Sequence, residues 1–168
     1  MTSPRAVLIG PPGSGKTTVG RMLAHRLGTG FRDTDADVET VAGKPVADIF
    51  VDDGEERFRE LEAAAVRQAL AGHDGVLALG GGAILSEATQ ELLDGHHVIY
   101  LQVGLTDAVQ RVGLAQARPL LVLNPRSQLK RLMEERRPVY ERLASIIVAT
   151  DGRQPEEIVG EILKGLPA

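Results

Sequence analysis

The segment at residues 10–17 has the residue types and spacing of a phosphate-binding loop. It reads Gly-Pro-Pro-Gly-Ser-Gly-Lys-Thr and matches the complete pattern G-x-x-x-x-G-K-S/T. An apolar run precedes it at residues 6–9, and a helix-like stretch follows it to Leu27. A strand, a glycine-rich loop and a helix in this order form a site for the phosphates of a nucleotide. A glycine-rich turn without a ligand is the alternative, and we predict that the chain binds ATP or GTP.

The parts of this loop are expected to perform different tasks. Its glycines let backbone N–H groups converge on phosphate oxygens, and the helix N-terminus adds a partial positive charge. We expect Lys16 to reach the β- and γ-phosphates and the hydroxyl of Thr17 to bind Mg²⁺. The predicted nucleotide contacts in this segment are Gly13, Ser14, Gly15, Lys16, Thr17 and Thr18.

Two carboxylates, Asp33 and Asp35, follow the next short apolar segment. We expect one of them to hold Mg²⁺ through water and the other to orient or deprotonate an acceptor hydroxyl. Aspartate and threonine are also good helix N-caps, so capping is an alternative role. The two roles can coexist.

Arg59 and Glu62 lie three residues apart in a predicted helix and are therefore neighbours on its surface. We expect Glu62 to aim the guanidinium of Arg59 at an anionic substrate. A solvated salt bridge of little consequence for stability is the alternative. Phe50 and Phe58 are expected to lie in the core, unless either forms the floor under a substrate ring.

Three consecutive glycines, Gly80, Gly81 and Gly82, follow the apolar run at residues 76–79. Glycine loses more conformational freedom on folding than any other residue, so packing alone does not favour this segment. We expect it where the hydroxyls of a ligand approach the backbone closely. A plain turn is the alternative.

The overall composition narrows the classes of function. The 168 residues are 43% hydrophobic and 25% charged, with a net charge of −4 and no cysteine. We expect one globular domain without thiol chemistry or cysteine-bound zinc, and without the basic excess of a nucleic-acid binder. The histidines show no metal-ligand spacing. With no signal peptide and no membrane-length apolar run, we expect a cytoplasmic protein that binds neither nucleic acid nor membrane. We also expect a monomer, although no residue pattern indicates the oligomeric state.

Strands and helices are expected to alternate along the chain. The predicted strands are 6–9, 31–34, 76–79, 98–103 and 146–149. The predicted helices are 16–27, 36–42, 46–51, 54–70, 87–93, 106–112, 126–143 and 155–163. This alternation predicts an α/β fold of three layers, with a five-stranded parallel sheet between helices and ligands at the carboxyl ends of the strands. Residues 113–127, with two prolines and two arginines, are expected to form a mobile lid that excludes water from ATP.

Taken together, six segments resemble those of the shikimate kinase family, and the resemblance runs nearly from end to end. The segments are 10–17, 33–35, 47–62, 79–82, 118–121 and 136–140. The resemblance implies the P-loop kinase fold and ATP-dependent phosphorylation of the 3-hydroxyl of shikimate to shikimate 3-phosphate. That reaction lies on the route to chorismate and the aromatic amino acids. The substrates would be shikimate and ATP, with Mg²⁺ as the cofactor.

The resemblance also implies residue roles. The catalytic residues would be Asp35, Lys16 and Arg118. The shikimate-binding residues would be Asp35, Arg59, Gly80, Gly81, Gly82, Arg136, Glu62, Phe50 and Phe58. ATP contacts beyond the phosphate loop would be Arg111, Arg118, Arg153 and Pro155. The metal contacts would be Thr17 directly and Asp33 through water. The domain would span 1–168, with substrate-binding helices at about 35–62 and a lid at about 113–127.

The family pattern Arg-x-Pro-x-Tyr selects Arg136 over its neighbour Arg137 for the substrate carboxylate. The two side chains point about 100° apart on a helix, so they cannot face one ligand in the same way. Three other functions stay open at this point. They are a gluconate kinase, a nucleotide kinase, and a nucleotide-binding module or switch without catalysis.

Overall fold

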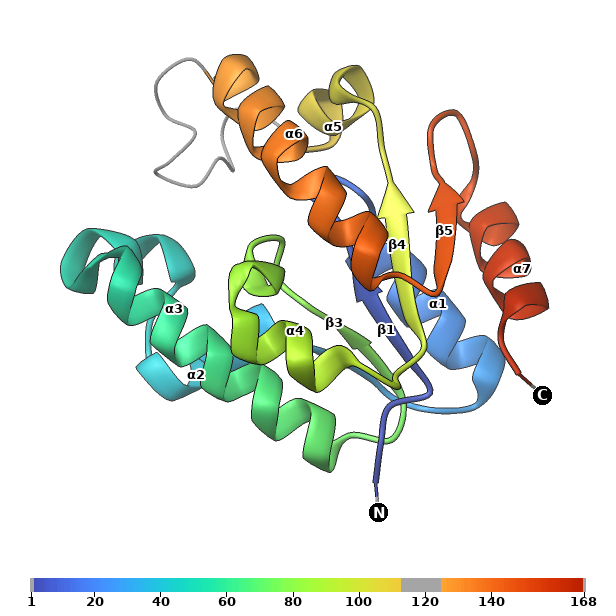
Figure 1. The fold of residues 1–168 in the computed structure, drawn as a ribbon, viewed down its shortest axis with the longest axis horizontal. Coiled ribbons are helices and arrows are strands. Elements are labelled where there is room, and N and C mark those ends of the chain that lie inside the picture. Colours follow the sequence, from blue (N-terminus) through green and yellow to red (C-terminus); the bar gives the residue numbers. More distant parts are fainter. Residues whose placement is uncertain (1, 113–124, 168) are drawn as a thin grey trace.

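A computed structural model of the chain describes residues 2–112 and 125–167. Five strands form one parallel sheet in the order β2-β3-β1-β4-β5 (Figure 1). The strands are β1 (Ala6–Ile9), β2 (Phe31–Asp33), β3 (Val76–Ala78), β4 (Val98–Gln102) and β5 (Ile146–Ala149). The predicted five-stranded parallel sheet is confirmed.

Helices connect the strands in the alternating order that the sequence predicted. They are α1 (Lys16–Leu27), α2 (Thr34–Ala42), α3 (Val46–Gly72), η1 (Ala83–Leu85), α4 (Glu87–Leu93), α5 (Leu105–Val112), α6 (Pro125–Leu143) and α7 (Pro155–Gly165). No helix in the described ranges combines the length and the apolar character that crossing a membrane requires.

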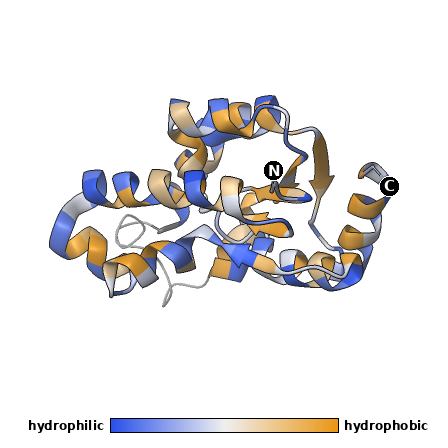
Figure 2. Ribbon diagram, turned by 90° about the horizontal axis from the view of Figure 1, so that it is seen from below, coloured by the Kyte–Doolittle hydropathy of each residue, from blue (hydrophilic) through white to orange (hydrophobic). Residues whose placement is uncertain are grey.

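The sheet is covered on both faces. On one face, Leu8 and Ile99 pack against Leu23 of α1 and Ile162 of α7. The helices α3, η1, α4 and α6 lie on the other face (Figure 1). Their side chains pack against the alternate strand residues. The strands are mostly hydrophobic and the helices alternate between polar and apolar residues, as Figure 2 shows. This pattern gives the three layers that the sequence predicted.

Several boundaries differ from the prediction. The predicted helices at 46–51 and 54–70 are parts of α3, which continues to Gly72 but departs from helical geometry at Gly54. The helix predicted from Ala36 begins at Thr34, because Asp33 caps it. The short helix η1 had no counterpart in the prediction. Residues 125–127, which the sequence placed in the lid, begin α6, and the rest of that predicted lid lies outside the described residues.

The strand order brings two chemically important segments together. Strand β3 lies between β1 and β2, and Asp33 at the end of β2 is paired in register with Ala78 at the end of β3. The chain after β2 and the glycines after β3 therefore leave the sheet side by side. The phosphate loop leaves the neighbouring strand β1 at the same edge.

Candidate active site

A cleft of about 520 Å³ lies at the carboxyl edge of the sheet. It is lined by Pro12, Gly13, Gly15, Lys16, Thr17, Thr18, Asp33, Asp35, Ala78, Leu79, Gly80, Gly81 and Arg111. Three segments that are far apart in the sequence thus share one cavity: the phosphate loop, the aspartate pair and the glycine segment Gly80–Gly82. This is the place where a parallel α/β sheet binds its ligands.

The phosphate loop has the backbone shape that its glycines permit. Gly13 and Gly15 have φ values of 82° and 91°, a region that residues with a side chain rarely occupy. Gly15 is also the N-cap of α1. The Lys16 ammonium donates hydrogen bonds to the carbonyl oxygens of Gly10 at 2.7 Å and Pro11 at 3.0 Å. The loop therefore holds the lysine charge over the N-terminus of α1, where phosphate binding is favoured.

Asp33 and Asp35 are close enough to influence each other. The Oδ1 of Asp33 accepts a hydrogen bond from the backbone N–H of Asp35 at 2.9 Å and so caps α2. Burial raises the pKa of Asp33, and the negative charge of Asp35 raises it further, while the Asp35 N–H and Lys16 act in the opposite direction. Asp33 is thus a helix cap and a desolvated carboxylate of the cleft at the same time.

The residues here fit a magnesium ion. Thr17, Asp33 and Asp35 line one cleft and offer the hard oxygen ligands that Mg²⁺ prefers. A nearby divalent cation would reduce the electrostatic repulsion between the carboxylates of Asp33 and Asp35. Within the described ranges, no cluster of three or more histidine, cysteine or acidic residues could hold a metal ion. Mg²⁺ usually keeps several waters and binds through few carboxylates and the substrate phosphates.

The glycine segment makes room for charged side chains. A Cβ atom placed on Gly80 would lie 2.6 Å from Oδ1 of Asp35 and 2.9 Å from Oε2 of Glu62. A Cβ atom on Gly82 would lie 2.5 Å from Nη1 of Arg59. The sequence interpretation named ligand hydroxyls as the atoms that approach these glycines. In the structure the side chains of the site itself come that close, which gives Gly80 and Gly82 a packing reason, and the predicted ligand contact of the segment stays a prediction.

Two guanidinium groups lie against this segment. Arg59 Nη1 is 2.8 Å from Glu62 Oε1, and Glu62 is only 2% exposed. Arg136 is 6% exposed, and its Nη1 would lie 3.4 Å from a Cβ atom on Gly81. The Nε of Arg136 is buried and has no hydrogen-bond partner among the described residues. Burying a cation with an unpaired N–H donor costs free energy. The burial of Arg136 therefore indicates a site for an anion.

Phe58 contacts Arg59, and Phe50 packs against Phe58. Phe58 is fully buried in a small core with Val38 and Ile49, and its ring lies 4.7 Å from that of Phe50. The guanidinium carbon of Arg59 lies 5.3 Å from the centre of the Phe58 ring. Neither phenylalanine lines the main cleft. Their positions fit a core role that holds the helix carrying Arg59.

The residues expected around adenine are not all in the cleft. Arg111 lines it and donates to the carbonyl oxygen of Gly13 at 3.1 Å and to Thr150. Arg153 instead donates to the carbonyl oxygen of Ala149 at 2.8 Å and pairs with Glu161 at 2.8 Å. Pro155 begins α7, and neither it nor Arg153 lines the cleft. Arg118 lies outside the described residues.

Sequence reasoning gave no role to two residues that shape the site. The hydroxyl of Thr34 accepts a hydrogen bond from the backbone N–H of Gly80 at 3.3 Å. The hydroxyl of Tyr140 donates to the carbonyl oxygen of Gly81 at 2.5 Å. Each residue lies inside a motif of the sequence: Thr34 between Asp33 and Asp35, and Tyr140 at the end of Arg-x-Pro-x-Tyr. Their partners depend on the strand order and could not be read from spacing.

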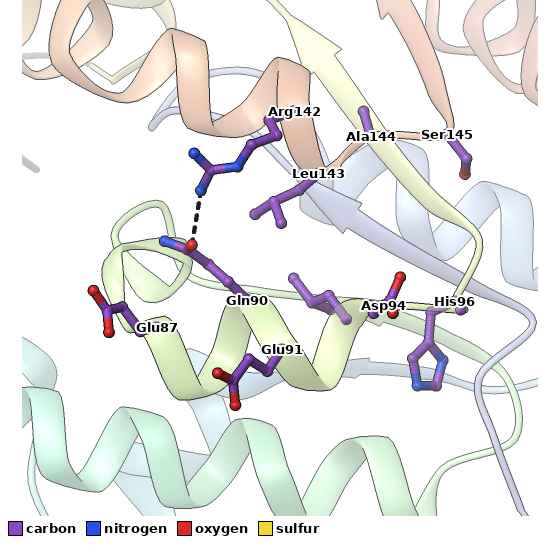
Figure 3. A pocket seen from close by; sticks show the side chains of 11 residues that line it. Glu87, Gln90, Glu91, Asp94, His96, Arg142, Leu143, Ala144 and Ser145 are labelled. Atoms are coloured by element: carbon purple, nitrogen blue, oxygen red, sulfur yellow. Dashed lines mark hydrogen bonds between the residues drawn. The ribbon is translucent and has the colours of Figure 1, made fainter.

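A second cavity, of about 670 Å³, lies at the opposite edge of the sheet (Figure 3). Its walls are α4 and the residues that lead into β4 and β5. Arg142 donates to Oε1 of Gln90 at 2.7 Å there, and Figure 3 shows this bond between the two walls. The cavity contains none of the phosphate loop, the aspartate pair or the glycine segment. The candidate active site is therefore the smaller cleft.

Comparisons with known proteins identify the family of the chain. The family model described as shikimate kinase matches residues 12–167. The shikimate kinase of Thermobifida fusca is 59% identical over 165 residues, which cover 98% of this chain and 96% of that protein. The shikimate kinase of Salinispora arenicola is 57% identical over 166 residues, 99% of each chain.

Solved structures place the chain in the same group. A shikimate kinase from Acinetobacter baumannii, in complex with shikimate, superposes with a TM-score of 0.92 at 35% identity and covers 98% of this chain and 92% of that one. A gluconokinase from Sinorhizobium meliloti has a TM-score of 0.56 at 21% identity, with 95% of this chain and 89% of that one covered, and shares the fold alone. The predicted P-loop kinase fold and family resemblance are confirmed: the chain belongs to the shikimate kinase family.

Proposed function

We propose that this chain transfers the γ-phosphoryl group of ATP to the 3-hydroxyl of shikimate, giving shikimate 3-phosphate and ADP in chorismate and aromatic amino acid biosynthesis. The observation that carries the proposal is the pair of guanidinium groups on the glycine segment, beside the phosphate-loop cleft. A small acid with several hydroxyls offers few apolar contacts. Charged hydrogen bonds must therefore supply most of its affinity.

The acceptor site is built from three elements. Arg59 on α3 and Arg136 on α6 bind the carboxylate, and the buried Glu62 fixes Arg59 by their ion pair. The backbone of Gly80–Gly82 lines the ring. Phe50 and Phe58 form the apolar support beneath Arg59.

The nucleotide site occupies the other part of the cleft. Backbone N–H groups of residues 13–18 bind the phosphates, and Lys16 neutralises charge at the γ-phosphate. Thr17 and, through water, Asp33 hold Mg²⁺, which supplies charge neutralisation on the phosphates. Arg111 contacts adenine from beside the phosphate loop, with Arg153 in the loop after β5 and Pro155 at the start of α7 as further contacts.

In the transfer step, the 3-hydroxyl oxygen bonds to the γ-phosphorus while the bond from that phosphorus to the β–γ bridging oxygen breaks. Asp35 orients the hydroxyl and accepts its proton. ADP leaves with the bridging oxygen. Lys16 and Arg118, the latter from the predicted lid, stabilise the charge of the transferring group.

At the level of the whole chain, we include in this proposal one domain over 1–168 that acts as a cytoplasmic monomer. Its substrate-binding helices are those at about 35–62, which carry Asp35, Arg59 and Glu62.

ADP release from ATP with different acceptors tests the proposal. We expect rapid turnover with shikimate and only background release with gluconate, AMP or no acceptor. Turnover with gluconate or AMP but not shikimate would assign another kinase activity. ATP binding without acceptor-dependent turnover would indicate a nucleotide-binding switch.

A further inference from the structure

Tyr140 connects α6 to the wall of the acceptor site. The residue is 1% exposed, and its hydroxyl donates to the carbonyl oxygen of Gly81 at 2.5 Å, across 59 residues of sequence. A backbone carbonyl in the interior needs such a partner. Tyr140 thus fixes one member of the glycine segment to the helix that carries Arg136.

The ring of Tyr140 is held in place on its other side. It stacks on Tyr100 of β4, with 5.0 Å between ring centres and 24° between planes. Burial raises the pKa of Tyr140 to about 12, so its hydroxyl keeps its proton and stays a donor at neutral pH.

Arg136 lies one helical turn before Tyr140 and contacts the same place. Residues four apart on a helix lie above one another on one face. The Arg136 guanidinium acts on Tyr140 through its charge and a hydrogen bond, both of which lower the tyrosine pKa against the effect of burial. Its Nη1 is also the side-chain nitrogen nearest to Gly81. Tyr140, Arg136 and Gly81 therefore form one contact group at the carboxylate end of the site.

We propose that Tyr140 is a positioning residue that sets the separation between the Arg136 guanidinium and the backbone of Gly81, and through it the affinity for the acceptor. This inference rests on the proposed function, because it concerns the binding of the acceptor acid. Tyr140 does not touch the reacting atoms in this role. It acts through Arg136 and Gly81, both of which its hydroxyl contacts.

The test compares Tyr140→Phe with Tyr100→Phe, which removes the hydroxyl of the ring stacked on it and leaves the bond to Gly81 intact. We expect Tyr140→Phe to raise the KM for shikimate about 2- to 13-fold, the net value of one hydrogen bond. The KM for ATP should stay within about twofold of the wild type. Tyr100→Phe should change neither constant by more than about twofold. Circular dichroism and active-site titration measure the folded fraction of each variant, so that the kinetic constants refer to folded enzyme.

A double-mutant cycle separates positioning from general support. In an Arg136→Ala background, Tyr140→Phe should have little further effect on the shikimate KM, because the residue through which it acts is gone. Equal rises in both KM values, full additivity with Arg136→Ala, or an unchanged shikimate KM would each overturn the inference. If the wild type itself shows no shikimate-dependent turnover, the proposed function fails and the inference fails with it.

Discussion

Arg136 carries a positive charge into the interior of the protein, where only 6% of the residue is exposed and its Nε has no partner among the described residues. Its neighbour Arg137 is exposed. Burial of this kind costs free energy in the empty site and is offset when a carboxylate binds. The adjacent arginines therefore provide a matched comparison at the residue scale.

We expect Arg136→Ala to weaken shikimate binding roughly 10- to 150-fold, the value of one charge-assisted hydrogen bond. ATP binding should barely change, because the phosphate loop is built by other segments. Arg137→Ala should leave both affinities unchanged. Isothermal titration calorimetry measures all four constants. Equal shikimate affinity of Arg136→Ala and wild type would remove Arg136 from the site.

Asp33 predicts a pH dependence of stability. Its native pKa lies above the ordinary value of 3.8, mainly through burial. Between pH 3.8 and the native pKa of Asp33, the native state therefore binds more protons than the unfolded state. The free energy of unfolding falls as the pH rises through this range. Asp33→Asn keeps the oxygen that caps α2 and removes the charge. In metal-free buffer we expect this variant to be more stable than the wild type near pH 7, with no difference below about pH 3.8.

Urea unfolding at several pH values between these limits measures the effect, and Asp74→Asn, at an exposed aspartate, is the control. The same Asp33→Asn variant should need more Mg²⁺ for half-maximal ADP release, since it has lost a carboxylate near the metal. A variant that is less stable than the wild type near neutral pH would show that the Asp33 charge is favourable in the fold.

Gly82 tests whether the glycine segment exists to admit side chains. A Cβ atom there would lie 2.5 Å from Nη1 of Arg59, the far end of a flexible side chain. The arginine can move away, so Gly82→Ala should fold, with a loss of stability from the broken ion pair between Arg59 and the buried Glu62. It should weaken shikimate binding about tenfold or more, since Arg59 leaves its place. Gly160→Ala, on α7 where a Cβ meets nothing within 4 Å, is the control and should not alter binding. Normal shikimate affinity in Gly82→Ala would contradict this account.

At the scale of elements, α3 is shaped by one residue. Gly54 has φ 87° and ψ 165°, inside an otherwise helical segment, and a Cβ atom there would meet nothing within 4 Å. Only the backbone conformation therefore requires glycine. The kink lets Ile49 on the first part of α3 pack with Phe58 on the second part. That small core supports the helix bearing Arg59 and Glu62.

We expect Gly54→Ala to lower the free energy of unfolding by about 1–3 kcal/mol, because this region of φ and ψ is accessible to glycine almost alone. Urea denaturation measures the loss. Gly160→Ala in regular helix should instead be neutral or stabilising by up to about 1 kcal/mol. An unchanged stability of Gly54→Ala would show that α3 can straighten at this point without cost.

The elements themselves were largely predictable because their signals are local. The apolar run at Ala6–Ile9 and the helical pattern at Glu87–Leu93 appear in the structure with the predicted bounds. The start of α2 was displaced by two residues, because the capping bond of Asp33 decides it and not the apolar periodicity. The break between the predicted helices at 46–51 and 54–70 is present as the kink at Gly54, where α3 departs from helical geometry.

At the scale of the whole molecule, the sequence predicted which segments carry chemistry but not all their contacts. Parallel strands imply a common edge for the loops, so the phosphate loop and Asp35 were expected together. The bonds from Thr34 to Gly80 and from Tyr140 to Gly81 span 46 and 59 residues. They exist because β3 is inserted between β1 and β2 and because α6 crosses that face. Strand order is a property of the packed chain that residue spacing does not encode.

Because the two ligand sites draw on different elements, each ligand should stabilise the whole fold separately. The acceptor site joins α3, the glycine segment and α6, while the phosphate site joins β1 and α1. At a concentration of 100 times Kd, either ligand adds about 2.7 kcal/mol to the free energy of unfolding. For a chain of this size, that corresponds to a rise in Tm of roughly 5–11 °C.

We expect shikimate and ADP each to raise the Tm of the wild type by this amount in differential scanning fluorimetry, and gluconate to raise it not at all. In Arg136→Ala, at the same concentrations, the shift with shikimate should fall to about half or less while the shift with ADP stays complete. The reason is that the variant removes one wall of the acceptor site and nothing from the phosphate loop. Loss of both shifts together would mean that Arg136 supports the fold rather than the ligand, and an undiminished shikimate shift would place the carboxylate elsewhere.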